Sequence, residues 1–231
     1  MVTSIMQPYF MPYIGYWQLL QVADIFVIYD DVAFINKGWI NRNQILTNNV
    51  QTMFTIPLIG ASQNKKINEI EIEWKSNWEK KFIKTIEQSY SKSISYKFFI
   101  PVLTEILNYK TEKISDYIAH SIQKMVEYLE INVTILQSEI YQNSNLKAQD
   151  RIIDICKQTA TETYINAIGG KSLYDIDSFR GHQIDLKFIE SLQLPYSQKS
   201  KTFIPYLSII DLCMNVEQKD IKNHLNSYQF I

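Results

Sequence analysis

The loop before residue 16 is rich in residue types suited to ligand binding. Pro8 and Pro12 restrict its backbone, and Gly15 allows close approach at the point where helical spacing begins. A helix that starts there has free N–H groups, which bind phosphate or carboxylate. A structural loop packed under aromatic side chains is the alternative. The candidate binding residues of this loop are Gln7, Tyr9 and Tyr13.

Asp30 and Asp31 follow a run of β-branched and aromatic residues that is typical of a strand. Their carboxylates suit a general base, a metal ligand or an acceptor for a sugar hydroxyl. Successive residues of a strand point to opposite faces, so we expect one of the two to line a pocket and the other to cap a turn. Both are candidate catalytic residues.

Residues 37–43 combine two cations, an aromatic ring and two amides. Arginine clamps a carboxylate or phosphate through two parallel hydrogen bonds, and tryptophan stacks on a sugar or a base. The segment therefore suits recognition of a nucleotide-linked compound, and a solvated hairpin tip is the alternative. The candidates are Lys37 for catalysis and Trp39, Asn41, Arg42 and Asn43 for binding.

A fourth group of candidates follows a predicted strand at residues 164–168. Two successive glycines there can form an anion-binding nest, although the segment matches neither a Walker loop nor a GxGxxG fingerprint. The segment is therefore only weak evidence for a phosphate-binding site. Its candidate binding residues are Gly170, Lys171 and Tyr174.

A fifth group, at residues 195–211, mixes aromatic and polar side chains. Ser208 can cap the helix that follows, and Asp211 then lies in the first turn. The helix dipole favours a carboxylate there whether or not it takes part in a reaction. The candidates are Tyr196, Gln198 and Ser208 for binding and Asp211 for catalysis.

The elements that must position these residues begin with a predicted strand at 3–6, a helix at 14–22 and a strand at 24–29. Because parallel strands need a crossover connection, this βαβ order predicts a mostly parallel, Rossmann-like α/β sheet. Ligands of such sheets bind beyond the carboxyl ends of the strands. The other predicted strands are 53–58, 67–72, 133–136, 164–168 and 184–188. Four further helices are predicted: one capped by Asn77, one that begins at Pro101, one at about 115–129 and one at about 148–159.

The 231 residues contain no internal repeat and no Pro/Gly/Ser linker, so we expect one domain, residues 1–231, with a helical lobe at about 75–130. Cys156 and Cys213 lie in apolar segments, which is typical of reduced, buried thiols and favours a cytoplasmic location. The sequence shows no secretion signal and no run of the roughly 18 apolar residues that a membrane span needs. A homodimer is compatible with the sequence.

The net charge is −1, from 23 basic and 24 acidic residues, so the sequence lacks the basic excess that is typical of a nucleic-acid-binding protein. An aminoacylated tRNA is still compatible with the sequence as the donor of an aminoacyl group. His120, His182 and His224 are far apart, and the cysteines lack CxxC spacing, so we expect no metal site. No signature of a serine or cysteine nucleophile occurs.

The most distinctive segment is 6–16, Met-Gln-Pro-Tyr-Phe-Met-Pro-Tyr-Ile-Gly-Tyr. It resembles the N-terminal signature of the WbqC-like family, and the resemblance spans nearly the whole chain. Many members of that family carry His where this chain has Met6, so we expect no catalytic histidine at that position. The other similar segments are 29–34, 39–45, 55–58, 196–198 and 203–215.

The resemblance implies a role in the biosynthesis of bacterial O-antigen or another surface polysaccharide. For such a protein we expect transfer of an N-acyl or N-aminoacyl group to the amino group of a nucleotide-linked deoxyamino sugar. A carboxylate would take the amine proton, cations would bind the diphosphate, and aromatic rings would hold the base and the sugar. The alternatives are an ATP-using, nucleotidyltransferase-like or ligase-type enzyme and a non-catalytic sugar-binding or assembly protein. The donor is not identified by the sequence, and ATP is compatible with it.

Overall fold

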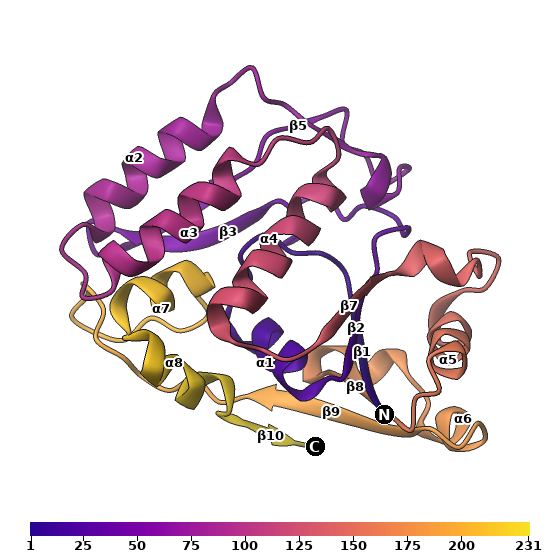
Figure 1. Cartoon of the computed structure of the whole chain (residues 1–231). Helices are drawn as coiled ribbons and strands as arrows, with labels where there is room; N and C mark the ends of the chain where they lie inside the picture. Colours follow the sequence, from indigo (N-terminus) through magenta and orange to yellow (C-terminus); the bar gives the residue numbers. More distant parts are fainter.

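A computed structural model describes residues 1–231, and its centre is a six-stranded sheet in the order β10-β9-β8-β1-β2-β7 (Figure 1). All neighbouring strands run parallel except the pair β9 and β10. This arrangement confirms the predicted α/β class with a mostly parallel sheet. The strands are β1 (Val2–Met6), β2 (Ile25–Ile28), β7 (Thr134–Gln137), β8 (Thr163–Ala167), β9 (Asp185–Ser191) and β10 (Tyr228–Phe230).

The two faces of the sheet are covered by different helices. Successive side chains of β2 alternate between them: Phe26 and Ile28 join the core on the side of α1 (Ile14–Val22), whereas Val27 joins a second core with Ile152 of α5 (Ala148–Gln158). The second core also contains Phe179 of α6 (Ile176–Arg180). Helices on both faces explain why the strands are apolar along most of their length.

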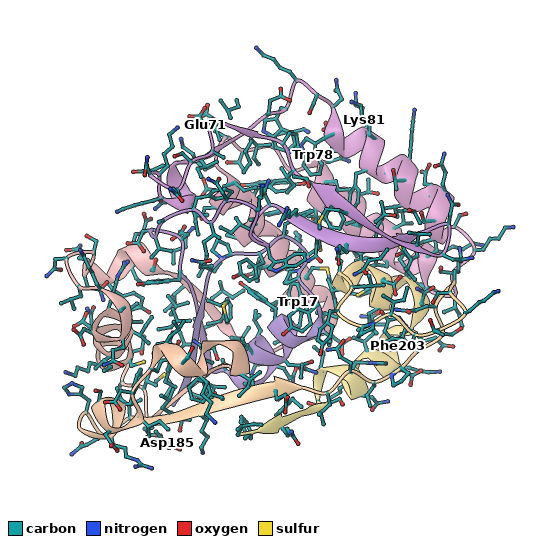
Figure 2. All side chains as sticks on the ribbon, turned by 180° about the vertical axis from the view of Figure 1, so that it is seen from behind. Trp17, Glu71, Trp78, Lys81, Asp185 and Phe203 are labelled. Atoms are coloured by element: carbon teal, nitrogen blue, oxygen red, sulfur yellow. The ribbon has the colours of Figure 1, made fainter.

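The helical lobe predicted for about residues 75–130 lies above the sheet, together with a hairpin (Figure 1). The main core of 42 buried residues is continuous between the lobe and the sheet and includes both Trp17 and Trp78 (Figure 2). The lobe consists of α2 (Trp78–Tyr90), α3 (Tyr96–Asn108) and α4 (Ile114–Leu129), and the hairpin of β3 (Arg42–Thr47) and β4 (Val50–Thr55). The remaining elements are β5 (Leu58–Ile59), β6 (Glu71–Ile72), α7 (Ile209–Asn215), α8 (Gln218–Leu225) and the 3-10 segments Ile67–Glu69, Ser138–Tyr141 and Ile168–Leu173.

Some predicted boundaries are wrong. Pro101 does not open a helix but lies inside α3, where its missing N–H leaves the carbonyl of the exposed residue Lys97 to water. Asn77 precedes α2, but its side chain forms no cap. Residues 53–58 divide between β4 and β5 because Pro57 interrupts the ladder, and only two residues of 67–72 form a strand. None of the helices combines the length and apolar character needed to cross a membrane.

Candidate functional site

A cavity of about 660 Å³ opens at the carboxyl ends of β1, β2 and β8. The chain leaves β1 through α1 to reach β2 on one side, whereas β8 lies on the other side of β1 and is reached through α5. The strand order therefore reverses between β1 and β8, and ligands of open α/β sheets bind in the crevice at such a point. Fourteen of the 20 lining residues are hydrophobic.

Two helices begin at the wall of this cavity. Gly15 lies in the first turn of α1, and Ala148 and Gln149 form the start of α5. Neither helix has a side-chain N-cap, so the N–H groups of both first turns are without a side-chain acceptor. The combined dipoles favour an anionic group between them.

Tyrosine dominates the polar part of the wall, and no Asp, Glu, His, Lys or Arg lines it. Burial raises the pKa of Tyr9, Tyr13 and Tyr16, so their hydroxyls stay protonated at neutral pH. Tyr16 donates a hydrogen bond to the carbonyl of Gln7 at 3.0 Å, whereas the Oε1 atom of Gln7 has no partner. The polar residues of the wall are Gln7, Tyr9, Tyr13, Tyr16, Tyr29, Gln149, Asn166 and Tyr174.

A buried charge pair lies directly behind one of these tyrosines. The guanidinium of Arg151 is 4.8 Å from the ring centroid of Tyr29 and is paired with the carboxylate of Asp31. Arg151 also donates to Asn143 at 2.9 Å, and its side chain is only 4% exposed. Burial raises the pKa of Tyr29, and the nearby guanidinium opposes this effect. The guanidinium of Arg151 therefore does not line the cavity, but it contacts Tyr29, which does.

Asp30 and Asp31 belong to this buried network, and neither lines the cavity. Asp30 accepts hydrogen bonds from Ser115 of α4 and from Ser138, while Asp31 accepts from Ser138 at 2.5 Å and from Arg151. Burial raises the pKa of Asp30. Burial also opposes ionisation of Asp31, but hydrogen bonds from Arg151 and Ser138 outweigh it and hold its pKa below the usual range. The two carboxylates join α4, α5 and the ends of β2 and β7.

The sequence profile of the WbqC-like protein family matches residues 7–223, from Gln7 at the cavity to α8. The chain belongs to the WbqC-like family. It is 27% identical over 216 residues to the uncharacterized protein Rv1507c of Mycobacterium tuberculosis, an alignment that covers 92% of this chain and 93% of the relative. No solved structure is significantly similar to the chain.

In this WbqC-like protein the predicted recognition loop lies outside the cavity wall. Arg42 donates to the carbonyl of Gly38 at 2.8 Å and to that of Lys37, and its guanidinium lies 5.8 Å from the ring of Trp39. These contacts close a turn. Asn41 donates to the carbonyl of Ile56 at 2.8 Å. The side chains of Asn41 and Arg42, which were predicted to bind a ligand, thus donate to backbone carbonyl groups of the protein itself.

Asn43 and Ser208 secure the loop that carries the family signature. Asn43 donates to the carbonyl of Met11 at 2.8 Å, and Ser208 donates to the same oxygen at 2.7 Å. Met11 has a positive φ of 47°, an uncommon conformation for a residue with a side chain, which these two bonds stabilise. The Oγ atom of Ser208 also accepts from the N–H of Ile210, so the predicted cap of α7 is confirmed.

Asp211 is fully buried in a separate cluster. Its carboxylate accepts from Tyr90 at 2.7 Å, from Tyr196 at 2.8 Å and from Gln198 at 3.0 Å. Burial raises its pKa, and these hydrogen bonds oppose the rise. Asp211 borders another cavity, of about 330 Å³, which includes Lys199 and none of the residues of the first. The cluster ties the segment 196–198 to α2 and α7.

The predicted residues therefore fall into two sets. Gln7, Tyr9, Tyr13, Gly170 and Tyr174 line the cavity of about 660 Å³. The predicted residues that do not line it are Asp30, Asp31, Lys37, Trp39, Asn41, Arg42, Asn43, Lys171, Tyr196, Gln198, Ser208 and Asp211.

The wall residues that were not predicted as site residues include Tyr29, Asn166 and the start of α5. Tyr29 and Asn166 each lie at the carboxyl end of a strand, which was the available signal for both. The start of α5 had no comparable signal, because nothing local to Ala148 shows that this helix begins beside β1. No group of three or more His, Cys, Asp or Glu side chains is placed to hold a metal ion.

Proposed function

We propose that this WbqC-like protein binds a nucleotide-linked deoxyamino sugar in the cavity at the β1–β8 switch point and transfers an acyl or aminoacyl group to its amino group. The reaction would modify a sugar for O-antigen or another bacterial surface polysaccharide. The position of the cavity carries the proposal: it lies where an α/β sheet binds nucleotides and is bordered by two helix starts. We place the reaction in the cytoplasm, in keeping with two buried free thiols.

The wall offers a suitable surface for each part of such a substrate. The faces of Tyr9, Tyr13 and Tyr174 suit a base and a sugar ring, because aromatic side chains stack on both. The free N–H groups at the starts of α1 and α5 suit the diphosphate, which needs no arginine or lysine when two helix dipoles face it. The volume of about 660 Å³ lies within the range of small-molecule sites.

The chemistry requires little from charged side chains. The neutral amine nitrogen of the sugar attacks the carbonyl carbon of an activated acyl donor, the bond to the leaving group breaks, and the leaving group takes the proton that the amine loses. A thioester, an aminoacyl ester of tRNA, or an acyl phosphate or acyl adenylate formed with ATP would serve as the donor. Formation of the acyl phosphate releases ADP, and formation of the acyl adenylate releases pyrophosphate. The wall supplies orientation and hydroxyl donors, which accelerate acyl transfer by positioning and by stabilising the developing negative charge.

A second candidate function is non-catalytic binding of the same sugars. It is favoured by one observation: no group able to act as a general base at neutral pH lines the cavity. A sugar-binding or assembly protein would need only the aromatic wall and the two helix starts. The two functions share the ligand and differ in turnover.

Mass spectrometry distinguishes these functions. The protein is incubated with UDP- and dTDP-linked amino sugars and with isotope-labelled amino acid plus ATP, acyl-CoA or charged tRNA. A mass increase on the sugar supports transfer, and release of ADP or pyrophosphate identifies the ATP-using version. Binding of a nucleotide sugar without any mass increase supports the non-catalytic function. Absence of both binding and transfer overturns the proposal.

A further inference from the structure

Tyr174 differs from the other tyrosines of the cavity because two buried polar groups surround its hydroxyl oxygen. The Nδ2 atom of Asn166 lies 3.0 Å from this oxygen, and the hydroxyl of Tyr164 lies 3.3 Å from it. The ring of Tyr174 packs edge-on against Phe179, with centroids 5.7 Å apart, so its direction is set by core packing.

The orientation of Asn166 follows from the backbone. Its Oδ1 atom accepts a hydrogen bond from the N–H of Ala167 at 2.7 Å, so the other end of the amide must be the NH₂ group. That NH₂ group has two protons and two neighbours: it donates to Tyr164 at 2.6 Å and to Tyr174 at 3.0 Å. Asn166 is 5% exposed, and the two tyrosine oxygens take up both protons of its NH₂ group.

The hydroxyl group of Tyr164 has one hydrogen-bond acceptor for its proton. Tyr164 is fully buried, and the oxygen of Tyr174 is its sole available acceptor, because Asn166 presents only protons to it. If Tyr174 donated to Tyr164 instead, the Tyr164 proton would be buried without a partner, which is costly. Tyr164 therefore donates to Tyr174.

The oxygen of Tyr174 thus accepts from both Asn166 and Tyr164, and its own proton has no partner within the protein. Tyr174 lines the cavity and is partly exposed, so a ligand or water in the cavity is the acceptor left for this proton. Two donors on a hydroxyl oxygen polarise it and strengthen it as a donor. The hydroxyl is an oriented donor that has no free lone pair for a ligand proton.

We propose that Tyr174 is a binding residue that donates a hydrogen bond to a phosphoryl oxygen of the substrate's diphosphate, with Asn166 and Tyr164 as its positioning residues. The choice of a phosphoryl oxygen rests on the proposed function and on two neighbours. Gly169 and Gly170 line the same wall, and no atom lies within 4 Å of the position of a Cβ on Gly169, so a ligand can approach the backbone there. The same geometry rejects an ammonium group, which offers only protons.

Calorimetry with dTDP, UDP and thymidine tests the ligand part of this proposal. We expect Tyr174→Phe to weaken dTDP and UDP at least about tenfold and to leave the affinity for thymidine unchanged, since thymidine has no phosphate. Asn166→Asp should have the same effect, because a carboxylate there accepts the protons of both tyrosines and draws that of Tyr174 away from the cavity. Tyr109→Phe, remote from the cavity and stacked on His120, is the matched control. Equal loss of thymidine and dTDP binding, or no loss, overturns the assignment.

Hydroxyl-proton NMR of the free protein separates this inference from the proposed function. We expect a slowly exchanging Tyr164 hydroxyl proton with a nuclear Overhauser contact to Tyr174, and rapid exchange of the Tyr174 hydroxyl proton. The reverse pattern overturns the inference even if nucleotides bind. In a further outcome the expected pattern is seen, but the wild-type protein binds neither dTDP, UDP nor the nucleotide sugars. That result would support the orientation of the Tyr174 hydroxyl and overturn both the proposed function and the assignment of a phosphoryl oxygen as its acceptor.

Discussion

The ring of Tyr13 occupies the space in which any side chain on Gly15 would begin. A Cβ atom at Gly15 would lie 2.5 Å from the hydroxyl oxygen of Tyr13 and 2.5 Å from its Cε2 atom. Both residues line the cavity, one in the loop and the other in the first turn of α1. Gly15 thus allows an aromatic ring to lie directly against the start of a helix.

Gly15→Ala should therefore displace the ring of Tyr13 from the cavity wall. We expect the free energy of unfolding to fall by about 1–2 kcal/mol, as for other overpacked interiors, and the affinity for dTDP to fall in parallel. Urea unfolding and calorimetry measure the two effects. The control is Gly181→Ala, because a Cβ on Gly181 meets its nearest atom at an ordinary 3.4 Å. Equal effects of the two substitutions would contradict the role assigned to Tyr13.

The ion pair of Asp31 and Arg151 predicts a large loss of stability when one partner is removed. Asp31→Asn leaves the guanidinium of Arg151 buried without its countercharge, and we expect a cost of about 3 kcal/mol in urea unfolding. Asp177→Asn is the matched control, because Asp177 pairs with Arg180 at the surface, where both side chains are more than two-thirds exposed. A similarly small effect of both substitutions would show that the buried pair does not contribute to stability.

The neighbouring aspartates should give the unfolding free energy opposite pH dependences. The pKa of Asp31 is lowered in the fold, so its stabilising contribution is present above the unfolded pKa and is lost as pH falls through the folded value. The pKa of Asp30 is raised, so its contribution is present at low pH and is lost as pH rises through the folded value.

Urea unfolding from about pH 3 to about pH 8 checks these signs. Relative to the wild type, Asp31→Asn should be most destabilised at neutral pH and less so in acid. The effect of Asp30→Asn should change in the opposite direction and be more favourable at neutral pH than in acid. Parallel pH profiles for the two variants would contradict the opposite shifts.

The buried cluster around Asp211 predicts local loosening when its carboxylate is removed. Asp211→Ala leaves the hydroxyls of Tyr90 and Tyr196 without their acceptor, and we expect a loss of about 3 kcal/mol. Residues 192–208 form no helix or strand, so new proteolytic cuts should concentrate there. Limited proteolysis with mass mapping measures this effect. The control is Asp185→Asn, because Asp185 is exposed. Unchanged cleavage of 192–208 would show that the cluster does not anchor this segment.

Much of the fold was predictable because its signals are local. The apolar spacing of 14–22 predicted α1 at the observed boundaries, and the runs at 3–6 and 24–29 predicted β1 and β2 to within one residue at each end. In contrast, β3 was missed because residues 42–47 form a strand only through pairing with β4, and their polar residues resembled a ligand loop. The pairing of β3 with β4 is seen only in the tertiary structure.

The candidate site was predictable to a lesser degree. Gln7, Tyr9 and Tyr13 of the loop before α1 all line the cavity, and their binding of a ligand stays a prediction. Arg42 was expected to bind a ligand, but carbonyl oxygens four and five residues earlier in the chain take up its protons. A polar side chain binds the nearest available partner, and residue type alone does not show whether that partner is substrate or backbone.

By itself the sequence determined the α/β class, the family and the loop that borders the cavity, because these depend on local patterns and on a signature within residues 6–16. The tertiary structure alone decided that Asp31 meets Arg151, 120 residues away, and that the start of α5 faces β1. It also brought Asn166 and Tyr164 to the hydroxyl oxygen of Tyr174. Such roles depend on which donors and acceptors folding brings within about 3 Å of one another, and this information is spread over the whole chain.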